Sequence, residues 1–355
     1  MSPLTRLLGL AGLCLAAQPA ASETLSDCFA ISDAQKRLAC YDQLARPTAV
    51  AQTAATPAAQ PAAATEPVGT EPAPVNSRSY LTRVWNLDGS SGKDDETRIG
   101  RLRPFKESYV LIRETNNTNM QPTSPAPGHT QNQASPTDHA EIKFQLSFKS
   151  EIASAYNLDT LGIKDIRVWG AYTQQSNWQA FNSINSSAFR ETNYEPEVIV
   201  SFIPQDQKGR LKLVNLGFNH QSNGQALPLS RSWNRVYLQG GWEWDNDISL
   251  LARGWYRVPE NPAQDDNPNI QDYMGYGDLV LHWQPDQSQS LNLLLRDNLR
   301  STQNRGMIQL DWATPLKLGN LAKLHLQASH GYGESLIDYN HHQTTLGIGF
   351  SFRDW

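Results

Sequence analysis

The chain of 355 residues is 18% charged, 39% hydrophobic and carries a formal net charge of −5. Its mean hydropathy of −0.53 excludes a bundle of transmembrane helices, and its longest apolar run, residues 7–17, is too short to span a bilayer as a helix. The acidic balance argues against nucleic acid as a partner. A polar average with ten Trp and twelve Tyr is instead typical of a transmembrane β-barrel, because lumen-facing residues lower the hydropathy.

The N-terminus has the pattern of a secretory signal peptide over residues 1–21. A basic residue, Arg6, precedes the apolar core, and small residues precede a plausible cleavage site before Ser22. Residues 22–44 predict a small helical cap in the periplasm, with a helix that starts near Asp33. Residues 45–77 are rich in Ala, Pro and Thr, which predicts a disordered linker.

Two cysteines, Cys28 and Cys40, remain after removal of the predicted signal peptide. An oxidising periplasm favours a disulfide between them. The alternative is two free thiols on a short helix.

Residues 78–355 predict an all-β domain, a twelve-stranded antiparallel transmembrane barrel. Residues 78–104 include a strand-like run, YLTRVWNLD, but have no clear assignment. From about residue 107 onward apolar and polar residues alternate in segments of roughly ten residues, the length that crosses a bilayer as a tilted strand. The expected strands are 107–115, 139–149, 164–174, 194–204, 210–222, 231–244, 247–257, 272–284, 287–298, 302–313, 319–331 and 342–354.

The connections between these strands support a barrel over a soluble β-sandwich. Long loops such as 116–138 and 258–271 alternate with short turns such as 205–209. Long loops outside and short turns inside are the outer-membrane pattern, and an even number of strands leaves both termini on the periplasmic side. A sandwich would also produce alternating strands, but it does not predict this asymmetry.

The hairpin of residues 216–237 carries three polar residues on an apolar face. His220 and Ser222 continue the parity of Leu216, and symmetric pairing about residue 227 places His220 opposite Asn234. A Ser nucleophile needs a base, and the base needs an acceptor that orients its ring. A single His or Ser at a barrel rim is usually a surface polar residue at the membrane interface, with no catalytic role. Three of them at this spacing predict a Ser-His-Asn triad, in which a neutral Asn suits a lipid-facing site.

NHQSNG (219–224) and SRSWNR (230–235) closely resemble outer membrane phospholipase A, an integral barrel enzyme. FRETNYEP (189–196), DDNP (265–268), YMGY (273–276) and GYGESLIDYN (331–340) are similar to the same family. The resemblance implies that Ser222 is the nucleophile, His220 the general base and acid, and Asn234 the residue that orients His220. It also implies that the backbone N–H of Gly224 helps to form the oxyanion hole.

The same resemblance implies calcium as cofactor and a homodimer as the active state. The ion would be held by the Ser230 hydroxyl, the Gln225 carbonyl and the partner subunit's Ser186, and oxygen ligands are the ones that calcium prefers. Asp266 matches one aspartate of a second calcium site in the family, whereas Leu227 stands in place of the other. Gln174 matches a polar residue of the family's dimer interface.

These observations predict calcium-dependent hydrolysis of phospholipid and lysophospholipid acyl esters in the bacterial outer membrane. One alternative is a barrel channel or a structural protein with a degenerate triad. Charges of both signs at the lumen parity, which would pair and plug the barrel, argue against a channel; they are Lys143, Asp278, Arg296, Asp311 and Lys323. Another alternative is a soluble periplasmic esterase.

Overall fold

The computed structural model describes residues 28, 30–33, 35–37, 40, 78–88, 100–185, 189–245, 247–286, 288–316 and 322–352. The chain divides into two units, residues 1–69 and residues 70–355. Among the described residues, helices are all too short or too polar to cross a bilayer. The predicted signal peptide and linker lie outside the described residues.

In the first unit the expected disulfide is present. Cys28 and Cys40 are joined with their Cα atoms 5.6 Å apart. Asp33 begins a helical turn, because its side chain accepts hydrogen bonds from the backbone N–H groups of Gln35 and Lys36.

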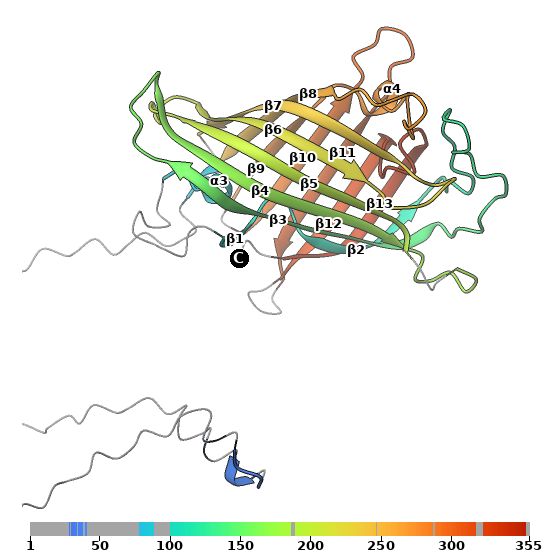
Figure 1. The fold of residues 1–355 in the computed structure, drawn as a ribbon, viewed down its shortest axis with the longest axis horizontal. Helices are drawn as coiled ribbons and strands as arrows, with labels where there is room; N and C mark the ends of the chain where they lie inside the picture. Colours follow the sequence, from blue (N-terminus) through green and yellow to red (C-terminus); the bar gives the residue numbers. More distant parts are fainter. Residues whose placement is uncertain are drawn as a thin grey trace, which may run out of the picture. The chain divides into compact units, whose positions relative to one another are not determined.

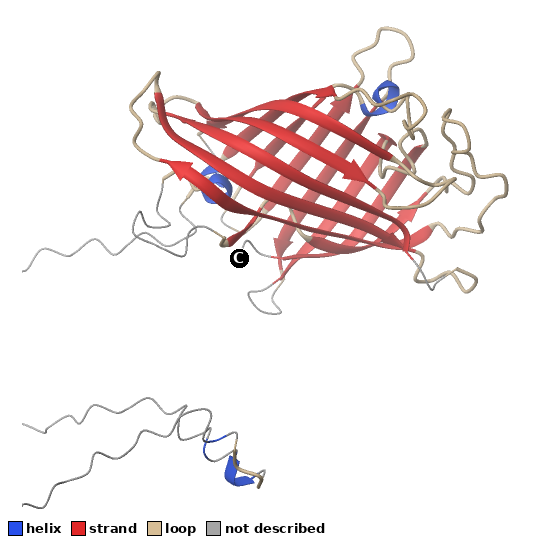
Figure 2. Ribbon diagram, in the orientation of Figure 1, coloured by secondary structure: helices blue, strands red, loops and turns tan. Residues whose placement is uncertain are grey.

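The second unit is a closed antiparallel barrel, as predicted (Figures 1 and 2). Strands β2 to β13 pair in chain order, and pairing of β13 with β2 closes the ring, while the short β1 (Leu102–Pro104) adds to β3. The barrel strands are β2 Tyr109–Thr115, β3 Ala140–Ala155, β4 Ile163–Trp178, β5 Phe189–Pro204, β6 Leu211–Ser222, β7 Ser232–Trp244, β8 Ile248–Arg257, β9 Gly277–Trp283, β10 Ser290–Asp297, β11 Gly306–Pro315, β12 Ala322–Tyr332 and β13 His342–Phe352.

One expected strand starts too early, and the region left unassigned contains a helix. The strand expected from residue 272 begins only at Gly277, because helix α4 (Gln271–Met274) occupies its first residues. The strand-like run in YLTRVWNLD is a helix, α3 (Tyr80–Trp85), with the Ser79 side chain at its N-cap. Its buried residues, Leu81, Val84 and Trp85, have the three- and four-residue spacing of one helical face.

The two faces of the wall differ as the alternation predicts. On β6, Leu216 and Phe218 are each 46% exposed, while Asn215 and Asn219 point into the barrel and are buried. Long connections, such as 116–139 and 258–276, all leave one end of the barrel, which we call the loop end. The opposite end carries shorter connections such as 205–210. In Figure 1, α4 lies at the loop end and α3 at the opposite end.

The lumen is filled at both ends. Helix α3 fills the end opposite the loops, where Trp85 packs edge-on against Trp169 and the Arg167 guanidinium donates to the Trp85 carbonyl. At the loop end the connection 333–341 folds inward, and its Glu334 pairs with Lys143 at 2.7 Å. Between them lies a cavity of about 330 Å³. This filling disfavours the channel, as the mixed charges of the lumen predicted.

A charge on the outer face tests the orientation of the wall. Leu216→Arg should lower the free energy of unfolding by about 2–4 kcal/mol, the cost of an arginine near the bilayer midplane. Leu216→Phe is the matched control, because Phe218 already occupies the same face, and it should unfold like the wild type. Urea titration of protein refolded into vesicles measures both. Equal stability of the two variants would mean that this face does not meet lipid.

Candidate active site

The hairpin of β6 and β7 places His220 and Asn234 side by side. The two residues are direct cross-strand partners, as the symmetry about residue 227 predicted. The Nδ1 atom of His220 lies 2.8 Å from the Oδ1 atom of Asn234. Because a carboxamide oxygen only accepts, Nδ1 carries the proton, and Nε2 is left as the basic nitrogen.

Ser222 lies two residues beyond His220 on the same outer face. Its cross-strand partners are Tyr194 on β5 and Ser232 on β7. Its hydroxyl makes no hydrogen bond with any other residue that the structure describes. Ser222 and His220 are therefore on one face at the loop end of the hairpin, but the structure does not show a hydrogen bond between them.

Gly224 opens the turn that follows β6. Its φ of +63° lies in the left-handed region, and a Cβ atom there would approach the Tyr194 ring to 3.1 Å. Gly224 is exposed. Its backbone N–H donates no hydrogen bond to another described residue. This donor, two residues after Ser222, is therefore available to an external acceptor.

The oxygens expected to bind calcium are partly gathered. The Ser230 hydroxyl donates to Asp266 Oδ2 at 2.7 Å, and Asp266 Oδ1 lies 2.9 Å from His129 Nε2. The Gln225 carbonyl accepts no hydrogen bond from another described residue, while the Gln225 side chain turns away to Glu191. Ser186 lies outside the described residues. Within the described part of the chain, no three His, Cys, Asp or Glu side chains form a metal cluster.

A buried carboxylate, Glu191, holds the turn after β6 against the plug of the barrel. It accepts hydrogen bonds from the Asn223 and Gln225 side chains at 3.3 and 2.9 Å, and from the backbone N–H of Ile337 at 3.0 Å. The turn that carries Gly224 is thus tied to the connection 333–341.

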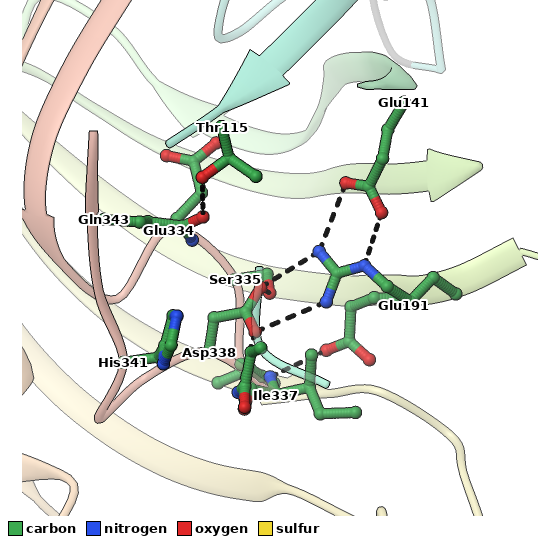
Figure 3. A network of polar contacts seen from close by, with 12 residues as sticks. Thr115, Glu141, Glu191, Glu334, Ser335, Ile337, Asp338, His341 and Gln343 are labelled. Carbon is green, nitrogen blue, oxygen red and sulfur yellow. Dashed lines mark hydrogen bonds and ion pairs between the residues drawn. The ribbon is translucent and has the colours of Figure 1, made fainter. Parts of the chain in front are cut away.

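The neighbouring Arg190 strengthens this attachment. Its guanidinium pairs with the carboxylates of Glu141 and Asp338. Figure 3 shows these two carboxylates as parts of the network that also includes Glu191. Burial by itself raises the pKa of Asp338, but the Arg190 charge lowers that pKa below its usual range, so the carboxylate stays ionised.

Removal of Glu191 should loosen this turn. We expect Glu191→Ala to lower the free energy of unfolding by about 2–5 kcal/mol, because several buried donors lose their acceptor. The exposed Glu114 provides the control, since Glu114→Ala removes the same group without burial. Thermal unfolding in detergent measures both variants. Equal melting temperatures would show that Glu191 does not support the turn.

The sequence did not predict the contacts of three residues at this site. Glu191, His129 and Glu260 each contact the site from another loop or strand; Glu260 Oε1 accepts from Asn234 Nδ2 at 3.1 Å. Glu191 stands within FRETNYEP, a motif that pointed to the region without giving its role. No signal in the sequence distinguished His129 or Glu260.

The fold and the site together define a membrane-spanning β-barrel with a His-Asn pair and a serine on its outer face. Comparison with known proteins specifies the family: residues 81–352 match the phospholipase A1 model, and the chain belongs to that family. Its members are carboxylic ester hydrolases, so this chain is an enzyme of that class.

Relatives from bacteria support the assignment. The chain is similar to a putative phospholipase A1 of Neisseria meningitidis, with 36% identity over 98% of this chain and 96% of the relative. Phospholipase A1 of Escherichia coli is 33% identical over 71% of this chain and 82% of that protein.

Solved structures of outer membrane phospholipase A have the same fold. An E. coli structure superposes with a TM-score of 0.59 at 33% identity, covering 71% of this chain and 98% of that one. A Salmonella typhi structure, a dimer with bound calcium, gives a TM-score of 0.62 at 31% identity, covering 77% and 98%. An active-site asparagine mutant of the E. coli protein superposes equally well, with a TM-score of 0.62.

Proposed function

We propose that this chain hydrolyses the acyl esters of phospholipids and lysophospholipids in the outer membrane, with Ser222, His220 and Asn234 as its triad. The observation that carries the proposal is the 2.8 Å contact between His220 and Asn234 on the lipid-facing wall, two residues along β6 from Ser222. The outer-membrane location is supported by the apolar outer face and by relatives that are outer membrane phospholipases. The helical cap would then lie in the periplasm.

The residues define a two-stage acyl transfer. Ser222 Oγ attacks the ester carbonyl as His220 Nε2 takes its proton, and the leaving alcohol then receives that proton from His220. A water, deprotonated by the same nitrogen, releases the fatty acid and restores Ser222. This transfer needs a hydrogen bond between Ser222 and His220 that the structure does not show, and catalytic hydrogen bonds in apo sites commonly tighten when substrate binds.

The Gly224 N–H would stabilise the oxyanion. It is an unpaired backbone donor close to Ser222, and preorganised donors of this kind contribute much of the rate in acyl transfer. The left-handed φ of +63° favours glycine here, and a side chain at residue 224 would also crowd the Tyr194 ring.

The donors near Ser230 fit calcium. The Ser230 hydroxyl lies beside the Asp266 carboxylate, and the Gln225 carbonyl accepts from no other described residue. All three are hard oxygen groups, which calcium binds in flexible sets. Ser230 and the Gln225 carbonyl would hold the ion together with the partner subunit's Ser186. Asp266, which the resemblance assigns to a second calcium site, lies 2.7 Å from the Ser230 hydroxyl and adds negative charge beside these ligands. Bound there, calcium would supply positive charge near the developing oxyanion.

A dimer face next to the site is consistent with the wall around Ser222. Gln174 on β4, Tyr194 on β5 and Ser222 on β6 are successive cross-strand neighbours along one row of the outer surface. Polar groups among apolar ones give barrel faces a means to associate in lipid. The relative from Salmonella typhi crystallised as a calcium-bound dimer.

Removal of Asn234 should lower the rate by less than removal of the general base itself. Asn234→Ala should lower kcat by less than the roughly 10²–10⁴-fold that a general base contributes, because His220 remains but loses its orientation. The exposed Gln264→Ala serves as the control and should behave as the wild type. Rates on a soluble thioester substrate measure both. Full activity of Asn234→Ala would remove Asn234 from the triad.

Product analysis tests the function itself. Purified protein added to vesicles of phosphatidylethanolamine with millimolar calcium should release free fatty acid and lysophospholipid, identified by mass spectrometry. A structural barrel releases neither product, so the absence of both would overturn the proposal.

A further inference from the structure

Asn234 is hydrogen-bonded on both sides of its carboxamide. Its Oδ1 atom accepts from His220 Nδ1 at 2.8 Å, and its Nδ2 atom donates to Glu260 Oε1 at 3.1 Å. Glu260 is half-buried and comes from the long connection after β8. It is a carboxylate that the mechanism above does not use.

The backbone fixes Glu260 in this place. The N–H of Val258 donates to the carbonyl of Asn234 at 2.8 Å, which continues the β7–β8 pairing beyond the last strand residue. Pro259 follows and restricts its own φ to near −65°. Two residues after Val258, the Glu260 side chain therefore returns to the same Asn234 whose backbone the segment has just contacted.

An asparagine in a triad presents a problem that an aspartate does not. The two ends of a carboxamide have nearly the same shape but opposite hydrogen-bonding character. If the amide flips, Nδ2 faces His220 Nδ1 and holds it as an acceptor, so the proton moves to Nε2. That tautomer cannot take a proton from Ser222, and an amide with this orientation costs serine hydrolases most of their rate.

We propose that Glu260 is a positioning residue that fixes the orientation of the Asn234 amide and thereby the His220 tautomer that deprotonates Ser222. A carboxylate can only accept, so it selects the Nδ2 end of the amide and leaves Oδ1 for His220. The proposal rests on the proposed triad and adds a fourth member, which acts through Asn234 and does not touch the substrate. Burial, together with the charge of Asp265, raises the pKa of Glu260, as expected for a half-buried carboxylate beside another one.

Single variants give the first test. Glu260→Ala should lower kcat roughly 10- to 150-fold, the worth of one hydrogen bond to a charged group, with KM on a soluble thioester unchanged. Glu260→Gln should keep at least about half of the wild-type kcat, because its amide oxygen can still accept from Asn234. Gln264→Ala in the same loop is the control for the loop itself. A kcat of Glu260→Ala equal to that of the wild type would overturn the proposal.

A second background separates orientation from mere structural support. In Asn234→Asp both side-chain oxygens accept hydrogen bonds. Either oxygen can therefore face His220 Nδ1, and Glu260 has no orientation left to select. Glu260 then faces a like charge, and adding Glu260→Ala should not lower kcat further and should raise it. The same fold loss in both backgrounds would mean that Glu260 supports the loop and does not orient Asn234.

The tautomer provides a readout that does not depend on activity. The ring ¹⁵N shifts of His220, assigned by comparison with His220→Gln in detergent micelles, should report a proton on Nδ1 in the wild type. Glu260→Ala should add the Nε2-protonated form, and an unchanged tautomer would contradict the proposal. Ser222→Ala keeps the two hypotheses distinct: its full activity would remove the triad, whereas its inactivity beside an unaffected Glu260→Ala would remove only the role of Glu260.

Discussion

Ser222→Ala should lose on the order of 10⁴-fold or more of the esterase rate while the barrel folds normally. Loss of a nucleophile removes the covalent route, and the remaining triad members contribute little without it. Folding should be unaffected, because the Ser222 hydroxyl makes no hydrogen bond with any other described residue and lies on the outer face. Initial rates of fatty-acid release, with heat-modifiable migration on gels as the test of folding, measure both properties.

Ser232→Ala is the matched control for this variant. Ser232 is the direct cross-strand partner of Ser222 and is also half-buried, but its hydroxyl points to Asp266 at 3.4 Å. We expect it to keep most of the activity. If Ser222→Ala and Ser232→Ala lost the same moderate fraction, the hydroxyl of Ser222 would not be the nucleophile.

Removal of calcium should cause the second large loss, roughly 10²–10³-fold in kcat. This is the worth of one charge or donor aimed at an oxyanion, and here the ion would complete what the Gly224 N–H begins. Chelation followed by a calcium titration of the rate measures it. Magnesium should restore less activity, because it requires near-ideal octahedral geometry and shorter ligand distances.

Ser230→Ala connects this loss to the proposed ligands. It should shift the calcium titration to higher concentrations, because one oxygen ligand is lost while the Gln225 carbonyl remains. Ser301→Ala is the matched control, because it removes the same hydroxyl from an exposed loop residue far from these ligands in the sequence, and it should leave the titration unchanged. A titration that is the same in Ser230→Ala and the wild type would place the ion elsewhere.

The barrel and the central pair of the site were predictable because local periodicity determines both. Alternation along β6 assigned His220 and Ser222 to the apolar face, and hairpin symmetry about residue 227 gave the pairing with Asn234 that the structure shows. Such inferences need only the period of a strand and a short turn. The same reasoning failed for α3, where a run of apolar residues suited a strand until its buried positions proved to be three and four apart.

Contacts between distant loops could not be predicted in this way. Glu260 meets Asn234 across 26 positions of sequence, and His129 meets Asp266 across 137. The closed ring of strands brings these loops together at one end, and neither loop carries a pattern that specifies its partner. The role of Glu191 likewise depends on the plug 333–341, which only the folded barrel places beside it.

Covalent labelling tests the central claim, that Ser222 on the lipid-facing wall is the nucleophile. An alkyl fluorophosphonate reacts with activated serines, and its chain matches a lipid-facing site. With calcium present, digestion and mass spectrometry should locate the label on Ser222, and the label should fall sharply in His220→Ala. Labelling of a different serine, or equal labelling of Ser222 with and without His220, would contradict the account.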